Sequence, residues 1–225
     1  MKGKLLPSLL SANMLFLKDE LQALERAGID ALHLDIMDGH FVPNLTFGPS
    51  MVSTLRKETS FWLDVHLMIQ PLHPMLASFV KAGAHSITFH VEATDTPLDV
   101  IQYIRSHGCS VGVSIKPKTS LQVLESLLPW VDLVLIMTVE PGFGGQTFMR
   151  EQLEKIQHLH RLKEKTNPHL IIEVDGGITP ESAHHCQTHG AQYFVAGTSV
   201  FQGGCSAIER NVAAFGSRLV EPLSA

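Results

Sequence analysis

The sequence predicts a (β/α)8 barrel, and three observations support that prediction. Short β-branched runs alternate with longer amphipathic runs along all 225 residues, and Gly, Pro, Asn or Asp stands at most of the joins. Eight strand-like runs can be counted, which is the number that closes such a barrel. A doubly wound sheet is the alternative, but it would usually carry G-x-G-x-x-G after its first strand, where this chain has SANMLF.

The predicted elements follow one another in a regular order. Strands are expected at residues 5–10, 31–37, 62–69, 86–92, 110–115, 133–139, 170–176 and 192–197. Each is expected to be followed by a helix, with the clearest helical runs at residues 17–28, 74–83, 97–108 and 179–190. Each of these four runs stops at a Gly, the residue that most readily adopts the left-handed conformation at a helix end.

Length and composition indicate one sizeable domain, expected to span residues 1–225. With 44% hydrophobic residues the chain can bury a large core, and no linker or shift in composition divides it. It lacks a long apolar run and a signal-peptide pattern, so we expect a soluble cytoplasmic protein without a membrane partner. Three widely spaced cysteines argue against disulfides, and a net charge of −5 without a basic block argues against nucleic-acid binding. Small-molecule chemistry is the better expectation.

Polar side chains occur where three predicted strands end. Because side chains alternate along a strand, His33 and Asp35 share one face of the second strand, as do Asp64 and His66 in the third and Glu173 and Asp175 in the seventh. Active sites of these barrels lie at the C-terminal ends of the strands, and a buried charge there must be paired or bind a metal. The four residues predicted to bind one divalent metal cation, Zn²⁺, Fe²⁺, Mn²⁺ or Co²⁺ rather than Mg²⁺, are His33, Asp35, His66 and Asp175.

Glycine-bearing loops follow the sixth, seventh and eighth predicted strands, with the sequences EPGFGGQ, DGGI and AGTS. Glycines allow backbone N–H groups to approach an anion, and barrels of this type commonly bind phosphate after strands seven and eight. No Walker A sequence is present, so a sugar phosphate is a better guest than a nucleotide.

Six segments of the chain together resemble the ribulose-phosphate 3-epimerase family. In chain order they are PSLLSAN, HLDIMDGHFVPNLTFGP, DVHLMI, EPGFGGQ, VDGGI and VAGTSVF. The resemblance implies a (β/α)8 barrel that interconverts D-ribulose 5-phosphate and D-xylulose 5-phosphate in the pentose phosphate pathway with a bound divalent metal. It also implies a homo-oligomer, a dimer or a hexamer.

The resemblance also implies a role for individual residues. Asp35 and Asp175 would be the acid/base pair besides being metal ligands, and Ser8 and His66 would contact substrate. Thr198 stands where many members of the family have Ser, but donation from the backbone survives that change. The residues expected to close over the substrate are Gly142, Phe143, Gly144 and Gly145, and those expected to hold the phosphate are Gly176, Gly177, Gly197 and Thr198.

Epimerisation next to a ketone removes a proton from one face of a carbon and returns one to the other face through an enediolate. Two carboxylates on opposite sides of the substrate can perform this exchange, and strands two and seven are well separated in a closed barrel. Met37, Met68 and Met137 fit an apolar cover that excludes water, although ordinary packing explains them equally well.

Other functions would leave different signatures in the sequence. An epimerase acting on D-allulose 6-phosphate would keep the same acid/base groups, a sugar-phosphate decarboxylase would place a Lys beside the acidic strand residues, and a non-catalytic sugar-phosphate-binding barrel would lack Asp35 or Asp175. We interpret Asp38 as a turn residue and HHCQTHG as a surface helix. His90 and Glu92 are expected on one face at the end of strand four, with an indirect or substrate-binding role open to them.

Overall fold

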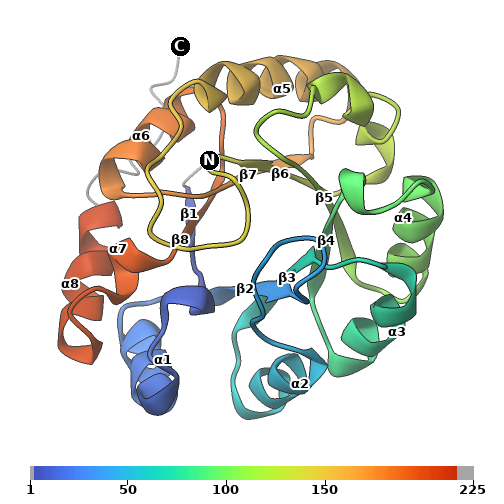
Figure 1. Ribbon diagram of the computed structural model, residues 1–225. Coiled ribbons are helices and arrows are strands. Elements are labelled where there is room, and N and C mark those ends of the chain that lie inside the picture. Colours follow the sequence, from blue (N-terminus) through green and yellow to red (C-terminus); the bar gives the residue numbers. More distant parts are fainter. Residues whose placement is uncertain (1–2, 217–225) are drawn as a thin grey trace.

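The computed structural model describes residues 3–216, which form a ring of parallel strands surrounded by helices (Figure 1). The strands are β1 (Lys4–Pro7), β2 (Ala31–Met37), β3 (Trp62–Met68), β4 (Ser86–His90), β5 (Ser110–Ile115), β6 (Leu133–Met137), β7 (Ile171–Asp175) and β8 (Tyr193–Ala196). They pair in the order β1-β8-β7-β6-β5-β4-β3-β2, and an isolated parallel bridge between Ser8 and His33 joins the two ends of the sheet. The predicted (β/α)8 barrel is confirmed; residues 1–2 and 217–225 of the predicted domain lie outside the described residues.

The outer layer consists of helices and short 3-10 turns. The α-helices are α1 (Leu17–Arg26), α2 (Pro49–Glu58), α3 (His73–Ala82), α4 (Pro97–Ser106), α5 (Gln152–Thr166), α6 (Pro180–Thr188), α7 (Thr198–Phe201) and α8 (Cys205–Gly216). The 3-10 turns are η1 (Leu9–Ser11), η2 (Met14–Phe16), η3 (Val91–Ala93), η4 (Leu121–Leu124) and η5 (Leu128–Trp130). No helix within residues 3–216 is long and apolar enough to cross a membrane.

Several predicted elements differ from the structure, and three of these differences have a clear physical reason or bear on the site. Between β5 and β6 the expected α-helix is replaced by η4 and η5, and Pro129 in η5 has no N–H with which to continue a longer helix. The first strand ends at Pro7 because the Ser8 side chain accepts a hydrogen bond from Leu10 N and so begins η1. The fourth strand ends at His90, and the chain turns into η3, so that Glu92 lies beyond the strand.

The two faces of the sheet bury different chemistry. Side chains on the outer face, such as Phe89 and Phe194, pack against the helices, and Phe61 and Phe79 are fully buried in the same core. Burying a side chain of this size stabilises the fold by about 1.5–3 kcal/mol. The inner face is polar for much of its height, with buried residues Ser86, Thr88, Ser114 and Glu173 besides those of the site. The barrel interior therefore carries ionisable groups that need partners.

Candidate functional site

A cavity of about 510 Å³ opens at the C-terminal ends of the strands. Its walls come mainly from the ends of β1, β2, β6, β7 and β8 and from the loops that follow them. The predicted site residues that line it are Ser8, Asp35, Gly142, Phe143, Gly144, Gly145, Asp175, Gly176, Gly177, Gly197 and Thr198. His33 and His66 are fully buried and lie outside this lining set. The structure thus brings the predicted acidic and glycine residues to one cavity.

The register between β2 and β3 brings the two imidazoles and Asp35 together. Asp35 pairs with His66 and His33 with Asp64 across the two strands. The Asp35 Oδ1 atom lies 3.4 Å from His33 Nε2 and 3.3 Å from His66 Nδ1. From β7, Asp175 Oδ2 lies 3.9 Å from the same His66 Nδ1. One atom from each of the four predicted ligands therefore faces a common point, with all four atoms within 4.8 Å of one another.

The donor set fits a divalent transition-metal ion. His33 Nε2 is buried and has no hydrogen-bond partner among the described residues, although it points toward Asp35. A buried nitrogen lone pair without a partner destabilises the fold unless a cation or proton satisfies it. Two imidazole nitrogens and two carboxylate oxygens are ligands that Zn²⁺ and Fe²⁺ accept.

Burial and neighbouring charges move the pKa values of the two site carboxyls in opposite directions. Burial alone would raise the pKa of Asp35, but the charge of His33 and the close approach of the His33 and His66 ring nitrogens lower it below its usual range. Burial, followed by repulsion from Asp35, raises the pKa of Asp175 to about 7. Near neutral pH, Asp35 is a carboxylate and Asp175 can hold a proton.

His33 lies among carboxyl groups on both sides of its ring. Burial would lower its pKa, but Asp35, Asp64 and Glu173 hold that pKa well above its usual value. The direction shows that the surroundings of His33 favour positive charge there. A divalent cation at Nε2 would supply that positive charge while the imidazole itself stays neutral.

Ser8 and Thr46 hold Asp35 from two sides. Ser8 is buried at the end of β1, and its Oγ donates to Asp35 Oδ2 at 2.5 Å. Thr46, in the loop after β2, donates its hydroxyl to the backbone carbonyl of Asp35. Ser8, predicted to contact substrate, thus lies beside Asp35 in the cavity wall, whereas Thr46 was not anticipated from the sequence.

Glycines allow the loops after β7 and β8 to pack tightly at one end of the cavity. Gly177 has φ +64°, and a Cβ atom there would lie 2.5 Å from the backbone N of Phe148. At Gly197 a Cβ atom would lie 2.4 Å from Ser11 Oγ. Only glycine fits at these close approaches, and the cavity wall there is therefore largely backbone, as a site for an anion requires.

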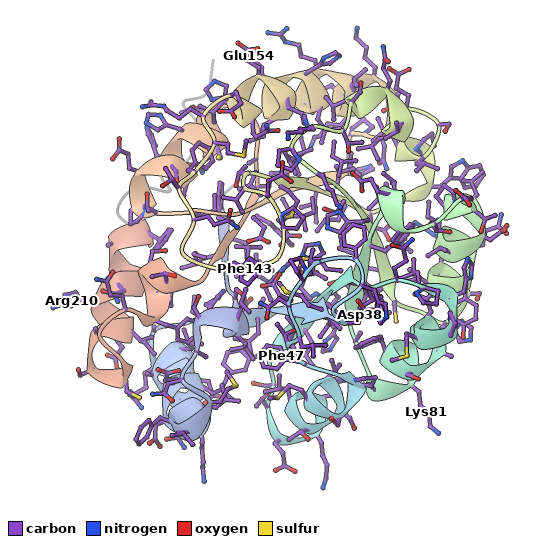
Figure 2. The ribbon with its side chains drawn as sticks, in the orientation of Figure 1. Asp38, Phe47, Lys81, Phe143, Glu154 and Arg210 are labelled. Carbon is purple, nitrogen blue, oxygen red and sulfur yellow. The ribbon has the colours of Figure 1, made fainter. Side chains whose placement is uncertain are left out.

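The loop after β6 passes over the barrel mouth and is tied to the loop after β2. Figure 2 shows Phe143 near the middle of the view, on the loop that follows β6, and its side chain is largely exposed. Asn44 Nδ2 donates to Gly142 O at 2.8 Å across the mouth. Gln146 Nε2 braces the same loop by donating to the carbonyls of Glu140 and Phe143 at 2.7 and 2.9 Å.

The remaining sequence interpretations have mixed outcomes. The interpretation of Asp38 as a turn residue is confirmed, because its carboxylate accepts from the backbone N–H groups of His40, Phe41 and Gln70. The histidine-rich segment is a helix, α6, but His185 lies on the cavity wall rather than purely at the surface. Met37, Met68 and Met137 are buried and line the cavity, as an apolar cover requires.

Sequence reasoning placed Asp64 and Glu173 on inward strand faces but gave them no role. In the structure they surround His33 from the barrel interior: Asp64 Oδ2 lies 2.7 Å and Glu173 Oε1 lies 3.6 Å from His33 Nδ1. The alternation of side chains predicts their direction, but the register that brings them to His33 is not readable from a single strand.

The chain is similar in sequence to known proteins. Residues 4–201 match the Ribulose-phosphate 3 epimerase family. The ribulose-phosphate 3-epimerase of Bacillus subtilis is 44% identical over 199 residues, covering 88% of this chain and 92% of that protein. The chloroplastic ribulose-5-phosphate-3-epimerase of Arabidopsis thaliana is 45% identical over 197 residues, covering 87% of this chain and 70% of that protein.

More distant solved structures share the fold. The 3-keto-L-gulonate-6-phosphate decarboxylase of Vibrio cholerae superposes with a TM-score of 0.69 at 16% identity, covering 97% of this chain and 98% of that one. A mutant tryptophan synthase alpha-subunit of Pyrococcus furiosus gives 0.71 at 14% identity, covering 96% and 98%. At such low identity the likeness concerns the barrel alone.

Proposed function

The chain belongs to the ribulose-phosphate 3-epimerase family and is an epimerase of that kind, and we propose that Asp35 and Asp175 are the acid/base pair of its reaction. Its substrates are then D-ribulose 5-phosphate and D-xylulose 5-phosphate. One observation carries the assignment of the pair: the buried carboxyl of Asp35 on β2 and the partly buried carboxyl of Asp175 on β7 face the same imidazole nitrogen, and their pKa values are moved apart.

The opposed pKa directions suit an exchange of protons across a carbon. Asp35 accepts the C3 proton of one epimer, while Asp175 donates a proton to the other face. The reverse reaction exchanges the two roles. Because the carboxyls interact through a shared neighbour, the pair titrates as a unit.

His33, Asp35, His66 and Asp175 would hold one divalent cation. When bound, such an ion stabilises the negative charge that develops on the substrate oxygens. The two imidazoles fit this task because neutral ligands leave the charge of the ion uncancelled. The class of ion that suits them is Zn²⁺, Fe²⁺, Mn²⁺ or Co²⁺.

Other residues bind and shield the sugar phosphate. Backbone N–H groups at Gly176, Gly177, Gly197 and Thr198 would bind the phosphate, and the loop of residues 142–145 would cover the sugar. Ser8 fixes the orientation of the Asp35 carboxylate. Met37, Met68 and Met137 line the cavity with apolar surface, which excludes water that would exchange protons with the enediolate.

A homo-oligomeric assembly and a cytoplasmic location stay predictions.

An isotope experiment tests the proposed pair. Purified protein, with divalent metal in excess, is incubated in D₂O with each pentulose phosphate separately. We expect Asp35→Asn and Asp175→Asn to lose turnover by about 100- to 10,000-fold. Each variant should still exchange the C3 proton of one epimer, and the two variants should act on opposite epimers, because each retains the base on one face.

The exposed loop carboxyl Asp95 provides the control substitution, Asp95→Asn, which should behave like the parent. A chelator arm, followed by restoration with each divalent ion, tests the metal requirement. Near-parental turnover in Asp175→Asn, or exchange of both epimers by a single variant, would show that the acid/base assignment is wrong.

A further inference from the structure

Each of the two predicted imidazole ligands, His33 and His66, has a second contact, at the ring nitrogen that faces away from the ligand cluster. His33 Nδ1 lies 2.7 Å from Asp64 Oδ2, and His66 Nε2 lies 2.9 Å from His90 Nε2. Neither Asp64 nor His90 is among the described residues that line the cavity, so neither is placed to touch substrate. Both are buried, and neither is one of the four ligands predicted from the sequence.

The contact between His33 and Asp64 determines which His33 nitrogen carries hydrogen. Asp64 Oδ1 accepts from Ser86 Oγ at 2.6 Å, and Ser86 Oγ in turn accepts from Trp62 Nε1 at 3.3 Å. An ionised carboxylate only accepts hydrogen bonds, so Asp64 Oδ2 requires a hydrogen on His33 Nδ1. The lone pair of the neutral ring is then on Nε2, the buried atom that lacks a partner.

Glu92 determines which nitrogen donates in the contact between His66 and His90. Two imidazole nitrogens 2.9 Å apart need one donor and one acceptor, and the pair alone allows either direction. His90 Nδ1 lies 3.3 Å from Glu92 Oε2. A neutral imidazole carries one hydrogen, so a His90 ring that donates to Glu92 from Nδ1 accepts at Nε2.

Glu92 is an acceptor on both of its oxygens. Its Oε1 accepts from Lys116 N at 2.8 Å and from Thr119 Oγ1 at 2.5 Å. Although burial would raise its pKa, hydrogen bonds from His90 and Thr119 lower the pKa of Glu92 to about 2. His90 must therefore donate from Nδ1 and accept at Nε2. His66 consequently donates from Nε2 and keeps its lone pair on Nδ1, the atom 3.3 Å from Asp35.

We propose that Asp64 and the His90–Glu92 pair are positioning residues that fix the tautomers of the two imidazole ligands, so that His33 offers Nε2 and His66 offers Nδ1 to the metal. The inference rests on the metal centre proposed above and goes beyond it by explaining how the chain prepares the two ligands. Residues of this kind orient ligand rings, and their loss typically weakens metal binding by about 10- to 100-fold.

The surroundings of the His90–Glu92 pair keep it in place. The ring of Phe41, from the loop after β2, packs against His90 with the centroids 4.7 Å apart, and Lys116 Nζ lies 4.0 Å from the centroid of the Phe41 ring. Lys155 Nζ donates to the carbonyls of Pro117 and Thr119, which belong to the loop after β5 that contacts Glu92. Loops after β2, β4 and β5 thus converge on a group that has no direct contact with the cavity.

Glu92→Gln is the most informative substitution because it keeps the size and shape of the side chain. Lys116 N and Thr119 Oγ1 both donate at the position of Oε1, so the amide oxygen of the introduced Gln should occupy that position. The NH₂ group of the amide then faces His90 Nδ1. His90 then carries its hydrogen on Nε2, and His66 has to carry its own on Nδ1, facing the metal. Asp64→Asn acts on His33 in the same way, since Ser86 selects the amide oxygen and the NH₂ faces His33 Nδ1.

The experiment compares the purified parent with Glu92→Gln, Asp64→Asn and the control Glu154→Gln, whose side chain points outward from α5 (Figure 2). Zinc dissociation constants are measured by chelator competition, and ¹⁵N chemical shifts of the imidazole nitrogens report the tautomers in the metal-free protein. We expect about 10- to 100-fold weaker zinc binding in both test variants. The hydrogen should move to His66 Nδ1 in Glu92→Gln, and Glu154→Gln should match the parent.

A second pair of variants keeps the test valid if a buried substitution prevents folding. His90→Gln retains an acceptor for His66 Nε2 and should bind zinc within a few-fold of the parent, whereas His90→Leu removes the acceptor and should not. Unchanged dissociation constants and unchanged tautomers in Glu92→Gln and Asp64→Asn would overturn the inference while leaving the metal centre intact. A parent that binds no divalent ion would instead overturn the metal centre, and the inference with it.

Discussion

Asp35 and Asp175 face the same nitrogen, His66 Nδ1, at 3.3 and 3.9 Å, yet the pKa of the first is lowered and that of the second is raised to about 7. These two carboxyls acquire different proton affinities because Asp35 lies against both imidazoles and accepts a hydrogen bond from Ser8. Repulsion from the ionised Asp35 then leaves the proton with Asp175. The asymmetry provides a base and an acid from one residue type.

Metal removal should lower the stability of the protein as well as its activity. The ligand cluster holds two carboxyls and a buried nitrogen lone pair without a partner. A single bound cation would satisfy all three groups. A divalent ion present at 100 times its dissociation constant should raise the free energy of unfolding by about 2.7 kcal/mol. Thermal unfolding with chelator and with increasing Zn²⁺ or Mn²⁺ measures this effect. A midpoint that is the same with chelator and with every ion would contradict the metal centre.

Ser8→Ala should impair catalysis without preventing folding. It removes the 2.5 Å hydrogen bond to Asp35 Oδ2, and a bond to a charged group contributes about 1.5–3 kcal/mol. If that interaction orients Asp35 for proton transfer, kcat should fall about 10- to 100-fold. Steady-state kinetics with D-ribulose 5-phosphate tests this, with Ser53→Ala on the exposed side of α2 as the control. Parental kcat in Ser8→Ala would show that Asp35 needs no such support.

Gly177→Ala should weaken binding of the sugar phosphate. A methyl group there would lie 2.5 Å from Phe148 N at φ +64°, so the loop after β7 must shift. Gly28→Ala is the matched control, since Gly28 has φ +79° but no neighbouring atom within 4 Å of the added methyl. Both variants should lose about 1–2 kcal/mol of stability through backbone strain. Only Gly177→Ala should raise KM, because the shift of the loop displaces backbone donors; loss of two of them corresponds to about 10-fold or more. An unchanged KM would mean that the phosphate binds elsewhere.

Stability should fall as the pH is lowered, through His90 and Glu92. The pKa of folded His90 is about 4 against a usual 6.5, and that of Glu92 is about 2 against 4.5. In both cases the unfolded chain binds the proton more readily, so acid favours unfolding. His90 contributes to this loss between about pH 6.5 and 4, and Glu92 between about 4.5 and 2. Each group contributes a slope of at most about 1.4 kcal/mol per pH unit.

Urea unfolding at several pH values, with chelator present so that metal release does not contribute, measures this slope. His90→Gln removes one of the two titrating groups and should flatten the curve between about pH 6.5 and 4. The control is Glu154→Gln, which should reproduce the parental curve. An equal slope in His90→Gln would mean that other groups cause the acid sensitivity.

Much of the fold and of the ligand set could be predicted from local pattern. Alternation of side chains is a local property, so it places His33 beside Asp35 on one face, and the pairing of Asp35 with His66 confirms that both strands deliver these groups together. Boundaries were less predictable, because the Ser8 side chain ends β1 by capping a turn. The segment between β5 and β6 forms 3-10 turns, since Pro129 prevents a longer helix.

Relations between distant segments could not be predicted from the sequence. The contact of Asp64 with His33 depends on strand register, and that of Glu92 with Lys116 and Thr119 depends on how two loops meet. Asn44 illustrates the same point, since nothing in PNLTFG indicates that its amide reaches Gly142, 98 positions later in the chain. Tertiary pairing of this kind is not encoded in any short pattern.

The hydrogen bond from Asn44 to Gly142 also bears on how quickly the barrel mouth can open. It couples the loops after β2 and β6, so that each restrains the other. A single bond of this kind contributes only about 1 kcal/mol, which changes an opening equilibrium by roughly five-fold. Lid loops of enzymes generally open in microseconds to milliseconds, and a bond of this strength would lengthen that time by no more than about five-fold.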